Sequence, residues 1–369
     1  MEPDLFPDTD LPERAHKGRG APANPDPRFA DWSRTKIDDG WSPEIAEAPA
    51  TEVLVDSAKT ILSHNDSPDL PFERSLNPYR GCEHGCIYCY ARPSHAFLGH
   101  SPGLDFETKL YHKAEAAKLL KRELTKPGYI VKPIALGTNT DAWQPIERRL
   151  RTTRAVLEVL LDLKHPAMLI TKSALVERDI DLLAAMAREH LVHAAISLTT
   201  LDGELARRLE PRASAPHARL ETIRKLADAG IPVTVMVSPV IPALTDHELE
   251  KVMAAAREAG AASASYSVLR LPHELHNLFE RWLAWHAPEK AARVMAILYD
   301  MRGGRANLGN DPRFAHRMQG LGHFADLLEQ RFALTKRRLG FPGLPELDCS
   351  RFKAPNAKSK TNEAQLGLF

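Results

Sequence analysis

The stretch Asn77–Pro93 reads NPYRGCEHGCIYCYARP and brings three cysteines into one short window. Cys82, Cys86 and Cys89 follow the spacing C-x3-C-x2-C, and Cys349 is the one other cysteine among the 369 residues. Thiolates that are so close together on one loop can reach a single metal centre. The window therefore predicts a metal centre held by these three side chains.

The window provides three cysteine ligands, one fewer than a metal site usually takes. Tetrahedral zinc and cubane iron–sulfur clusters both usually take four protein ligands. A cluster held by three cysteines leaves one iron open to an exogenous ligand, and an open position is where chemistry takes place. The alternative is a structural zinc ion completed by His84, His95 or Cys349. Unligated thiols would have no reason to gather here.

Composition and charge limit the classes of protein that fit. Hydrophobic residues make up 43% of the chain and charged residues 26%, as in a globular enzyme. No apolar run approaches the roughly 18 residues that span a bilayer, and the acidic, proline-rich N-terminus does not resemble a secretion signal. We expect a cytoplasmic protein that is not bound to a membrane. The net charge of +1 argues against a strong overall field for nucleic acid but is compatible with a local basic groove.

The chain after the cysteine window alternates short apolar runs with amphipathic helical segments. The runs recur at intervals of about thirty residues, the length of a β-loop-α unit, and cover residues 132–140, 167–173, 193–200, 232–240 and 262–271. Nearly continuous apolar strands are typical of a parallel sheet covered by helices. With the segment before Cys82 this gives six units. The pattern predicts an α/β fold, a partial (β/α)6 TIM-like barrel with an N-terminal extension and a C-terminal helical segment.

The composition divides the chain into four parts. Residues 1–50 are expected to be an extended or disordered arm, and residues 51–272 the barrel core. The core begins with two short β-rich runs that we expect to form a small hairpin or a sheet edge. Residues 273–345 have a helical pattern and are expected to pack beside the barrel. Residues 346–369 read as a polar tail.

The cysteine window, with the aromatic Tyr88 before its last cysteine, resembles the radical S-adenosylmethionine (SAM) superfamily over roughly residues 72–272. The segments GTNTDAWQPIE, LITKSALVERDIDLL and RGGRANL make it similar to the branch of spore photoproduct lyase and DNA-repair-photolyase-like proteins. The resemblance implies that Cys82, Cys86 and Cys89 hold a [4Fe–4S] cluster whose open iron binds SAM. It further implies that one electron, from a donor such as flavodoxin or ferredoxin, cleaves SAM to a 5′-deoxyadenosyl radical that abstracts a substrate hydrogen.

Residues at the carboxyl ends of the strands are the expected SAM contacts, because ligands of open parallel sheets bind there. The sequence GTNTD (137–141) departs from the Gly-Gly-Glu pattern common in the superfamily. The resemblance places Lys172 and Ser197 where a lysine and a serine hold SAM, and burying Lys172 without an anion would be costly. The full set of expected contacts is Tyr88, Thr138, Asn139, Asp141, Lys172, Ser173, Ser197 and Ser238. Three of these residues have a structural alternative to SAM binding. Asp141 could cap a helix, Lys172 could form an ion pair with a neighbouring carboxylate, and Tyr88 could be an aromatic residue of the core.

The sequence names neither a catalytic residue nor a single substrate. The lyase-like resemblance implies DNA or RNA, and basic residues that could contact phosphate are found at 151–154, at 336–338 and at Arg302, Arg305, Arg313 and Arg317. Solvated helix faces would explain the same residues. Cys349 does not match the motif of the lyase's hydrogen donor and is expected to be a structural thiol. The alternatives are a radical SAM enzyme acting on a protein or a small molecule, and a non-enzymatic zinc-stabilised binding module.

Overall fold

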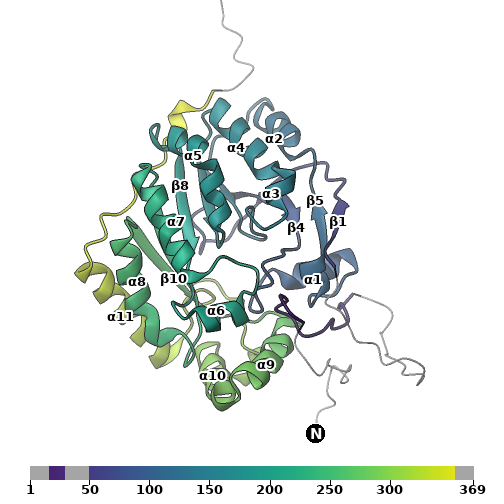
Figure 1. Ribbon diagram of the computed structural model, residues 1–369, viewed down its shortest axis with the longest axis vertical. Coiled ribbons are helices and arrows are strands. Elements are labelled where there is room, and N and C mark those ends of the chain that lie inside the picture. Colours follow the sequence, from purple (N-terminus) through teal and green to yellow (C-terminus); the bar gives the residue numbers. More distant parts are fainter. Residues whose placement is uncertain (1–15, 30–49, 354–369) are drawn as a thin grey trace, which may run out of the picture.

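The computed structural model describes residues 16–29 and 50–353 (Figure 1). Its centre is a seven-stranded sheet with the spatial order β10-β9-β8-β7-β6-β3-β2. Six strands run parallel, and β2 pairs antiparallel with β3 at one edge. The strands are β2 (Leu62–His64), β3 (Arg74–Leu76), β6 (Ile134–Leu136), β7 (Ala167–Thr171), β8 (Val192–Ser197), β9 (Val233–Val240) and β10 (Ser263–Val268). The predicted partial barrel of six β/α units is confirmed.

Helices cover the outer face of this sheet (Figure 1). In β9, Val233, Val235 and Val237 are buried in the main core, whereas the residues between them are half-buried and face the other way. The covering helices are α2 (Ala116–Leu124), α4 (Thr152–Asp162), α5 (Ile180–Ala187), α7 (Pro216–Asp228) and α8 (Leu249–Glu258). Shorter helices lie in the connections: α1 (Asp105–Thr108), α3 (Glu147–Leu150) and α6 (Gly203–Leu209). The carboxyl ends of the parallel strands lie together at one end of the sheet.

The two β-rich runs near the start of the core are sheet edges, which is one of the two outcomes expected for them. The β-rich runs near the start of the core do not form a hairpin. The first is β1 (Glu52–Val55), an edge of a separate small sheet with β5 (Lys109–His112) and β4 (Tyr79–Arg80), whereas β2 is an edge of the main sheet. Each run is therefore an edge strand: β1 pairs with the distant β5, and β2 pairs with β3, the next strand along the chain. The helices α3 and α4 are separated at Arg151, whose φ is 52°.

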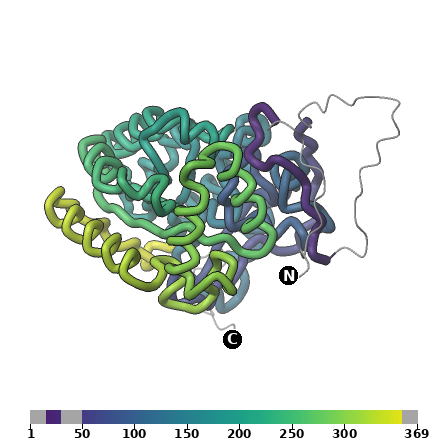
Figure 2. The backbone as a smooth tube through the Cα atoms, turned by 90° about the horizontal axis from the view of Figure 1, so that it is seen from below, coloured from purple at the N-terminus to yellow at the C-terminus, as the bar shows by residue number. Residues whose placement is uncertain are grey.

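The C-terminal helices cover the cysteine loop as well as the barrel. Helices α9 (Leu275–His286) and α10 (Pro288–Met301) share a second core with Cys86, Ile87 and Tyr88. Helix α11 (Gly322–Arg338) packs against α8 and α10 and lies on the far side of the molecule from residues 16–29 (Figure 2). The segment expected to lie beside the barrel thus also buries the site predicted to bind metal.

Residues 341–353 run beneath the sheet, past the amino ends of its strands. Their backbone amides donate to carbonyls that precede the strands: Gly343 to Ala262, Asp348 to His190 and Lys353 to Leu163, each at 2.9 Å. Residues 1–15 and 30–49 of the predicted arm and 354–369 of the predicted tail lie outside the described residues. No helix within 16–29 and 50–353 is long and apolar enough to cross a bilayer.

One pH effect on stability arises in this lower region. His165 is buried, its Nε2 lies 2.9 Å from the Tyr129 hydroxyl, and burial lowers its pKa from 6.5 to about 4. Between pH 6.5 and pH 4, His165 is therefore protonated in the unfolded chain but stays neutral in the folded chain. We expect the free energy of unfolding to fall by about 3 kcal/mol from this residue between pH 6.5 and pH 4. Urea unfolding of wild type and His165→Phe across this range checks it: the variant should show the shallower pH dependence, and parallel curves would contradict the assignment.

Candidate active site

The three cysteines lie on a loop, residues 81–89, that follows β4 at the carboxyl end of the barrel. Two of its glycines have positive φ, which lets the backbone turn sharply. The amide of Cys82 donates to the Phe106 carbonyl at 2.9 Å, and that of Ile87 donates to the Leu209 carbonyl at 3.0 Å. The loop is thus attached to segments on both sides, which fixes where its thiols lie.

A buried ion pair between Arg92 and Glu107 supports the backbone of the same loop. Arg92 is fully buried and donates to the carbonyls of Cys86 (2.9 Å) and Gly85 (3.0 Å). Its charge is balanced by the buried carboxylate of Glu107. Because the guanidinium bonds the loop backbone directly, the positions of the cysteines depend on this pair.

Residues 16–29 form a further layer on the cysteine loop (Figure 2). The amides of Gly20 and Ala21 donate to the two oxygens of Glu107 at 2.9 and 2.8 Å. A Cβ on Gly20 would lie 1.7 Å from the Gly85 carbonyl oxygen, so only glycine fits there. This part of the predicted arm therefore contacts the loop through its backbone.

The cysteine thiols have the chemistry that a metal cluster requires. Cys82 and Cys86 are buried, Cys89 is half-buried, and all three are free. Burial raises the pKa of Cys82 and of Cys86, and the nearby carboxylates of Asp141 and Glu210 respectively raise it further. Such thiols become thiolates only when a positively charged centre binds them. The donor set therefore fits an iron–sulfur cluster.

Among the residues considered as a fourth ligand for zinc, each histidine has one ring nitrogen bound within the protein and Cys349 is distant, whereas the Nδ1 atom of His95 is buried with no hydrogen-bond partner among the described residues. The Nδ1 atom of His84 lies 3.3 Å from Asp141 Oδ2, and the Nε2 atom of His95 lies 2.9 Å from the Lys109 carbonyl. Cys349 begins a 3-10 turn beneath the sheet, at the end opposite the cysteine loop. Across 16–29 and 50–353, no three His, Cys, Asp or Glu side chains converge on a single ion position. A cubane needs no such convergence, since each cysteine binds a different iron.

A chain of polar side chains joins the ends of four neighbouring strands beside this loop. The Lys172 ammonium donates to Ser197 Oγ at 2.6 Å, and Ser197 donates to the Ser238 carbonyl at 3.0 Å. The Ser238 and Ser267 hydroxyls are hydrogen-bonded to each other. Lys172 also lies over the Tyr88 ring, with Nζ 5.7 Å from the centroid. The predicted residues Lys172, Ser197, Ser238 and Tyr88 are thus brought together.

A buried ion pair supports Tyr88 and Ser197 from below. The Tyr88 hydroxyl donates to Glu210, which also accepts from Thr199 at 2.9 Å. Arg219 pairs with Glu210 and donates to the Ser197 carbonyl at 2.9 Å. Burial alone would raise the pKa of Glu210, but Arg219 and Lys172 lower it to about 2. The charges of the pair therefore compensate each other inside the protein.

Asp141 is bound by its own protein surroundings. Its carboxylate accepts from the Thr171 hydroxyl and the Lys172 amide, both at 2.8 Å, and from the Trp143 amide at 2.8 Å. Burial would raise its pKa, but the adjacent His84 ring and these hydrogen bonds keep it below its usual value. Asp141 thus connects the ends of β6 and β7, and its contact with SAM stays a prediction.

Three other predicted residues lie at the same edge and make local structural hydrogen bonds. The Thr138 carbonyl accepts from the Tyr90 hydroxyl, and the Asn139 amide donates to Asn77 Oδ1 at 3.0 Å. The Ser173 hydroxyl caps the short helical segment that follows β7. Contact of all three with SAM stays a prediction.

Comparison with known proteins identifies the family. Residues 76–256 match the family described as the radical SAM superfamily. An uncharacterised protein of Mycobacterium tuberculosis is 38% identical over 230 residues, 62% of this chain and 68% of that protein. The chain belongs to the radical SAM superfamily. A radical SAM Nα-GlyT isomerase of a Pseudomonas phage is 27% identical over 173 residues, 46% of this chain and 34% of that protein. A solved structure of a spore photoproduct lyase variant has a TM-score of 0.52 at 16% identity, covering 79% of each chain, and shows the same fold.

Radical SAM proteins use a [4Fe–4S] cluster and SAM, and the cysteine loop provides three thiols for such a cluster. The fourth cysteine is at the other end of the barrel, so a cluster held by this loop would have one iron without a protein thiolate. The sequence resemblance to this superfamily is therefore confirmed.

The residues that sequence analysis missed are the buried charges. The role of Arg219 could have been predicted from the sequence. It shares a helix face with Ile223 and Leu226, and an arginine on an apolar stripe requires a buried partner. Arg92 and Glu107 had none, since their roles depend on tertiary contacts with the cysteine loop.

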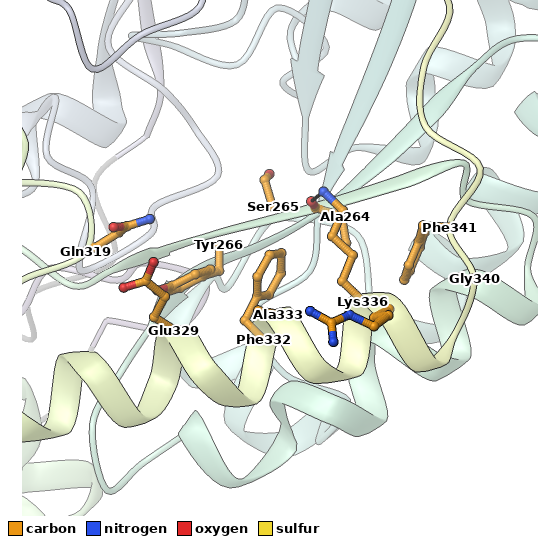
Figure 3. Close-up of a pocket in the computed structure, with 11 residues that line it drawn as sticks. Ala264, Ser265, Tyr266, Gln319, Glu329, Phe332, Ala333, Lys336, Gly340 and Phe341 are labelled. Atoms are coloured by element: carbon orange, nitrogen blue, oxygen red, sulfur yellow. Dashed lines mark hydrogen bonds between the residues drawn. The ribbon is translucent and has the colours of Figure 1, made fainter.

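A hollow of about 650 Å³ on another face is separate from this site (Figure 3). It lies between β10 and α11 and includes Tyr266, whose ring packs on Phe332 with centroids 4.7 Å apart. Ser267, the next residue of β10, points to the opposite face, where it meets Ser238. The hollow is thus on the helix-covered side of the sheet.

Proposed function

We propose that this protein is a radical SAM enzyme whose cluster is held by Cys82, Cys86 and Cys89. When bound, the cluster and SAM supply a 5′-deoxyadenosyl radical through one-electron reduction, and this radical abstracts a hydrogen atom from the substrate. The electron comes from a small redox protein of the flavodoxin or ferredoxin class. The observation that carries the proposal is the position of three free thiols, two buried and one half-buried, beside a lysine at the carboxyl ends of the parallel strands.

Lys172 is the proposed partner of the SAM carboxylate. Its ammonium is bonded to Ser197, and no carboxylate of the described residues lies within ion-pair distance of it. A half-buried ammonium in that position favours an anionic ligand. Ser197 and the Glu210–Arg219 pair act through Lys172 and Tyr88 by holding these side chains in place.

Nucleic acid is the substrate class that we propose, and a protein or small molecule is the alternative. The support lies in the arginines around the open side of the barrel, described below. A zinc-stabilised module is disfavoured, because the described residues offer no single-ion site beside the cysteines.

The test of this function is a change at Lys172. Lys172→Met is expected to weaken SAM binding roughly 10- to 100-fold, as loss of one charge-assisted hydrogen bond would. Equilibrium dialysis of labelled SAM against the reconstituted protein measures it, with iron content as the check on the cluster. The matched control is Lys225→Met, which removes an exposed lysine on α7 paired with Glu177. Unchanged SAM affinity in Lys172→Met would refute the proposed contact.

A further inference from the structure

The partial barrel has an open side between its two edge strands, β10 and β2, and one segment bridges it. The amide of Val268, at the end of β10, donates to the Met318 carbonyl at 2.8 Å. A few residues earlier, the amide of Ala315 donates to Asp69 Oδ1 at 2.7 Å, and Arg317 Nε donates to Asp69 Oδ2 at 2.7 Å. Asp69 lies in the loop after β2. We call residues 313–318 the bridging segment.

Arg302, the first residue of the sequence RGGRANL, fixes this segment to β10. It is fully buried and donates only to backbone carbonyls: to Val268 and Leu269 at the end of β10, and to His316 and Arg317 in the bridging segment. These acceptors carry no formal charge, so Arg302 has a structural role. The bridging segment is therefore positioned independently of any ligand.

Arg270 lies next to the bridging segment and differs from the arginines around it. Its guanidinium lies 4.7 Å from the centroid of the Tyr90 ring. Arg317 is paired with Asp69 and Arg313 with Asp311, whereas Arg270 has neither an ion pair nor a hydrogen bond to any described side chain. Because Asp69 is already bound by Arg317, the Arg270 charge has no ion-pair partner among residues 16–29 and 50–353.

This charge lies close to the proposed chemistry. Tyr90 follows Cys89 directly, and its hydroxyl donates to the Thr138 carbonyl at the end of β6. Tyr90 is 46% exposed, so its ring remains accessible to a ligand while it supports the arginine. A second exposed aromatic ring, Phe314, lies in the bridging segment with the Arg317 guanidinium 5.0 Å from its centroid. Arginines on accessible aromatic rings bind phosphates and stack bases.

We propose that Arg270, supported by Tyr90, binds a phosphate group of the substrate at the open side of the barrel. The inference rests on the proposed function and specifies the substrate class as one that carries phosphate. A guanidinium matches phosphate oxygens through two parallel hydrogen bonds, and the partial burial of Arg270 strengthens such a contact. The same chemistry is presented by a nucleic-acid strand and by a free nucleotide, and the binding assay separates them.

The experiment measures binding of a labelled single-stranded oligodeoxynucleotide to the reconstituted protein in the presence of SAM, by fluorescence anisotropy over a range of salt. A nucleoside monophosphate and a glutamate-rich peptide serve as competitors. Arg270→Gln should weaken binding at least about tenfold and reduce the slope of log K against log salt by about one, while Arg270→Lys should keep part of the affinity. The matched control, Arg224→Gln, removes an exposed arginine on α7 that is paired with Glu221, and it should bind like wild type.

Stronger competition by the monophosphate than by the oligonucleotide would assign the phosphate to a free nucleotide and support the inference. Equal affinity of wild type and Arg270→Gln for every phosphate probe would overturn it, as would displacement by the peptide alone or no binding of any phosphate probe. SAM cleavage under dithionite without substrate is measured on the same wild-type preparation. Its failure would refute the proposed function, and the binding comparison would still report on Arg270.

Discussion

Cys86→Ala is expected to lose both the iron–sulfur cluster and SAM cleavage. The remaining two thiols cannot hold a cubane that already lacks a fourth protein ligand. The alanine fits the loop, whose backbone is held by Arg92 and by the amides of Cys82 and Ile87. Iron and sulfide analysis after anaerobic reconstitution, with chromatographic detection of 5′-deoxyadenosine, measures the loss.

The matched control for this change is Cys349→Ala. Cys349 lies beneath the sheet, next to residues that precede the strands, so its removal should leave iron content and SAM cleavage as in wild type. If Cys86→Ala kept its cluster, or if Cys349→Ala lost it, the assignment of the ligands would be wrong.

Arg219→Met should be the most damaging change that leaves the cysteines intact. This change leaves the Glu210 carboxylate buried without its ion-pair partner. Its remaining hydrogen bonds come from the neutral hydroxyls of Tyr88 and Thr199. Breaking one side of a buried ion pair costs about 3–5 kcal/mol. Urea unfolding monitored by circular dichroism should show this loss, and SAM affinity should fall with it because Tyr88 and Ser197 lose their support.

Helix α7 offers its own control for this prediction. Arg224→Met removes an arginine from the same helix, but its pair with Glu221 is exposed and should add little to stability. The double variant Glu210→Gln, Arg219→Met should regain part of the lost stability, because it no longer buries an unpaired charge. Similar unfolding curves for Arg219→Met and Arg224→Met would show that the buried pair does not support the site.

The parts of the fold that were predictable depend on local periodicity. Five of the six parallel strands coincide with the predicted apolar runs, and the sixth, β3, lies in the segment before Cys82. Of the two outcomes expected for the β-rich runs, the sheet edge is the one found: the first run pairs with β5 far along the chain and the second with β3, and nothing local in the sequence encodes that choice.

The candidate site was predictable where it depended on one loop or on strand ends. Cysteine spacing identified the loop, and the carboxyl-end rule led to Lys172 and Ser197, which are in contact. The supporting charges Arg92, Glu107 and Glu210 were not predictable. Glu107 and Glu210 accept hydrogen bonds from Gly20 and Tyr88, which lie far along the chain, so these contacts become evident only in the fold. Arg92 bonds backbone carbonyls, which no side-chain pattern reveals.

The most direct test of the central claim is the metal content of the purified protein after anaerobic loading, combined with its reaction with SAM. If three thiols hold a cluster with one open iron, the protein will contain about four irons and four sulfides per chain and will form 5′-deoxyadenosine from SAM under dithionite. A protein that takes up zinc but no iron or sulfide, and leaves SAM intact, would contradict the claim.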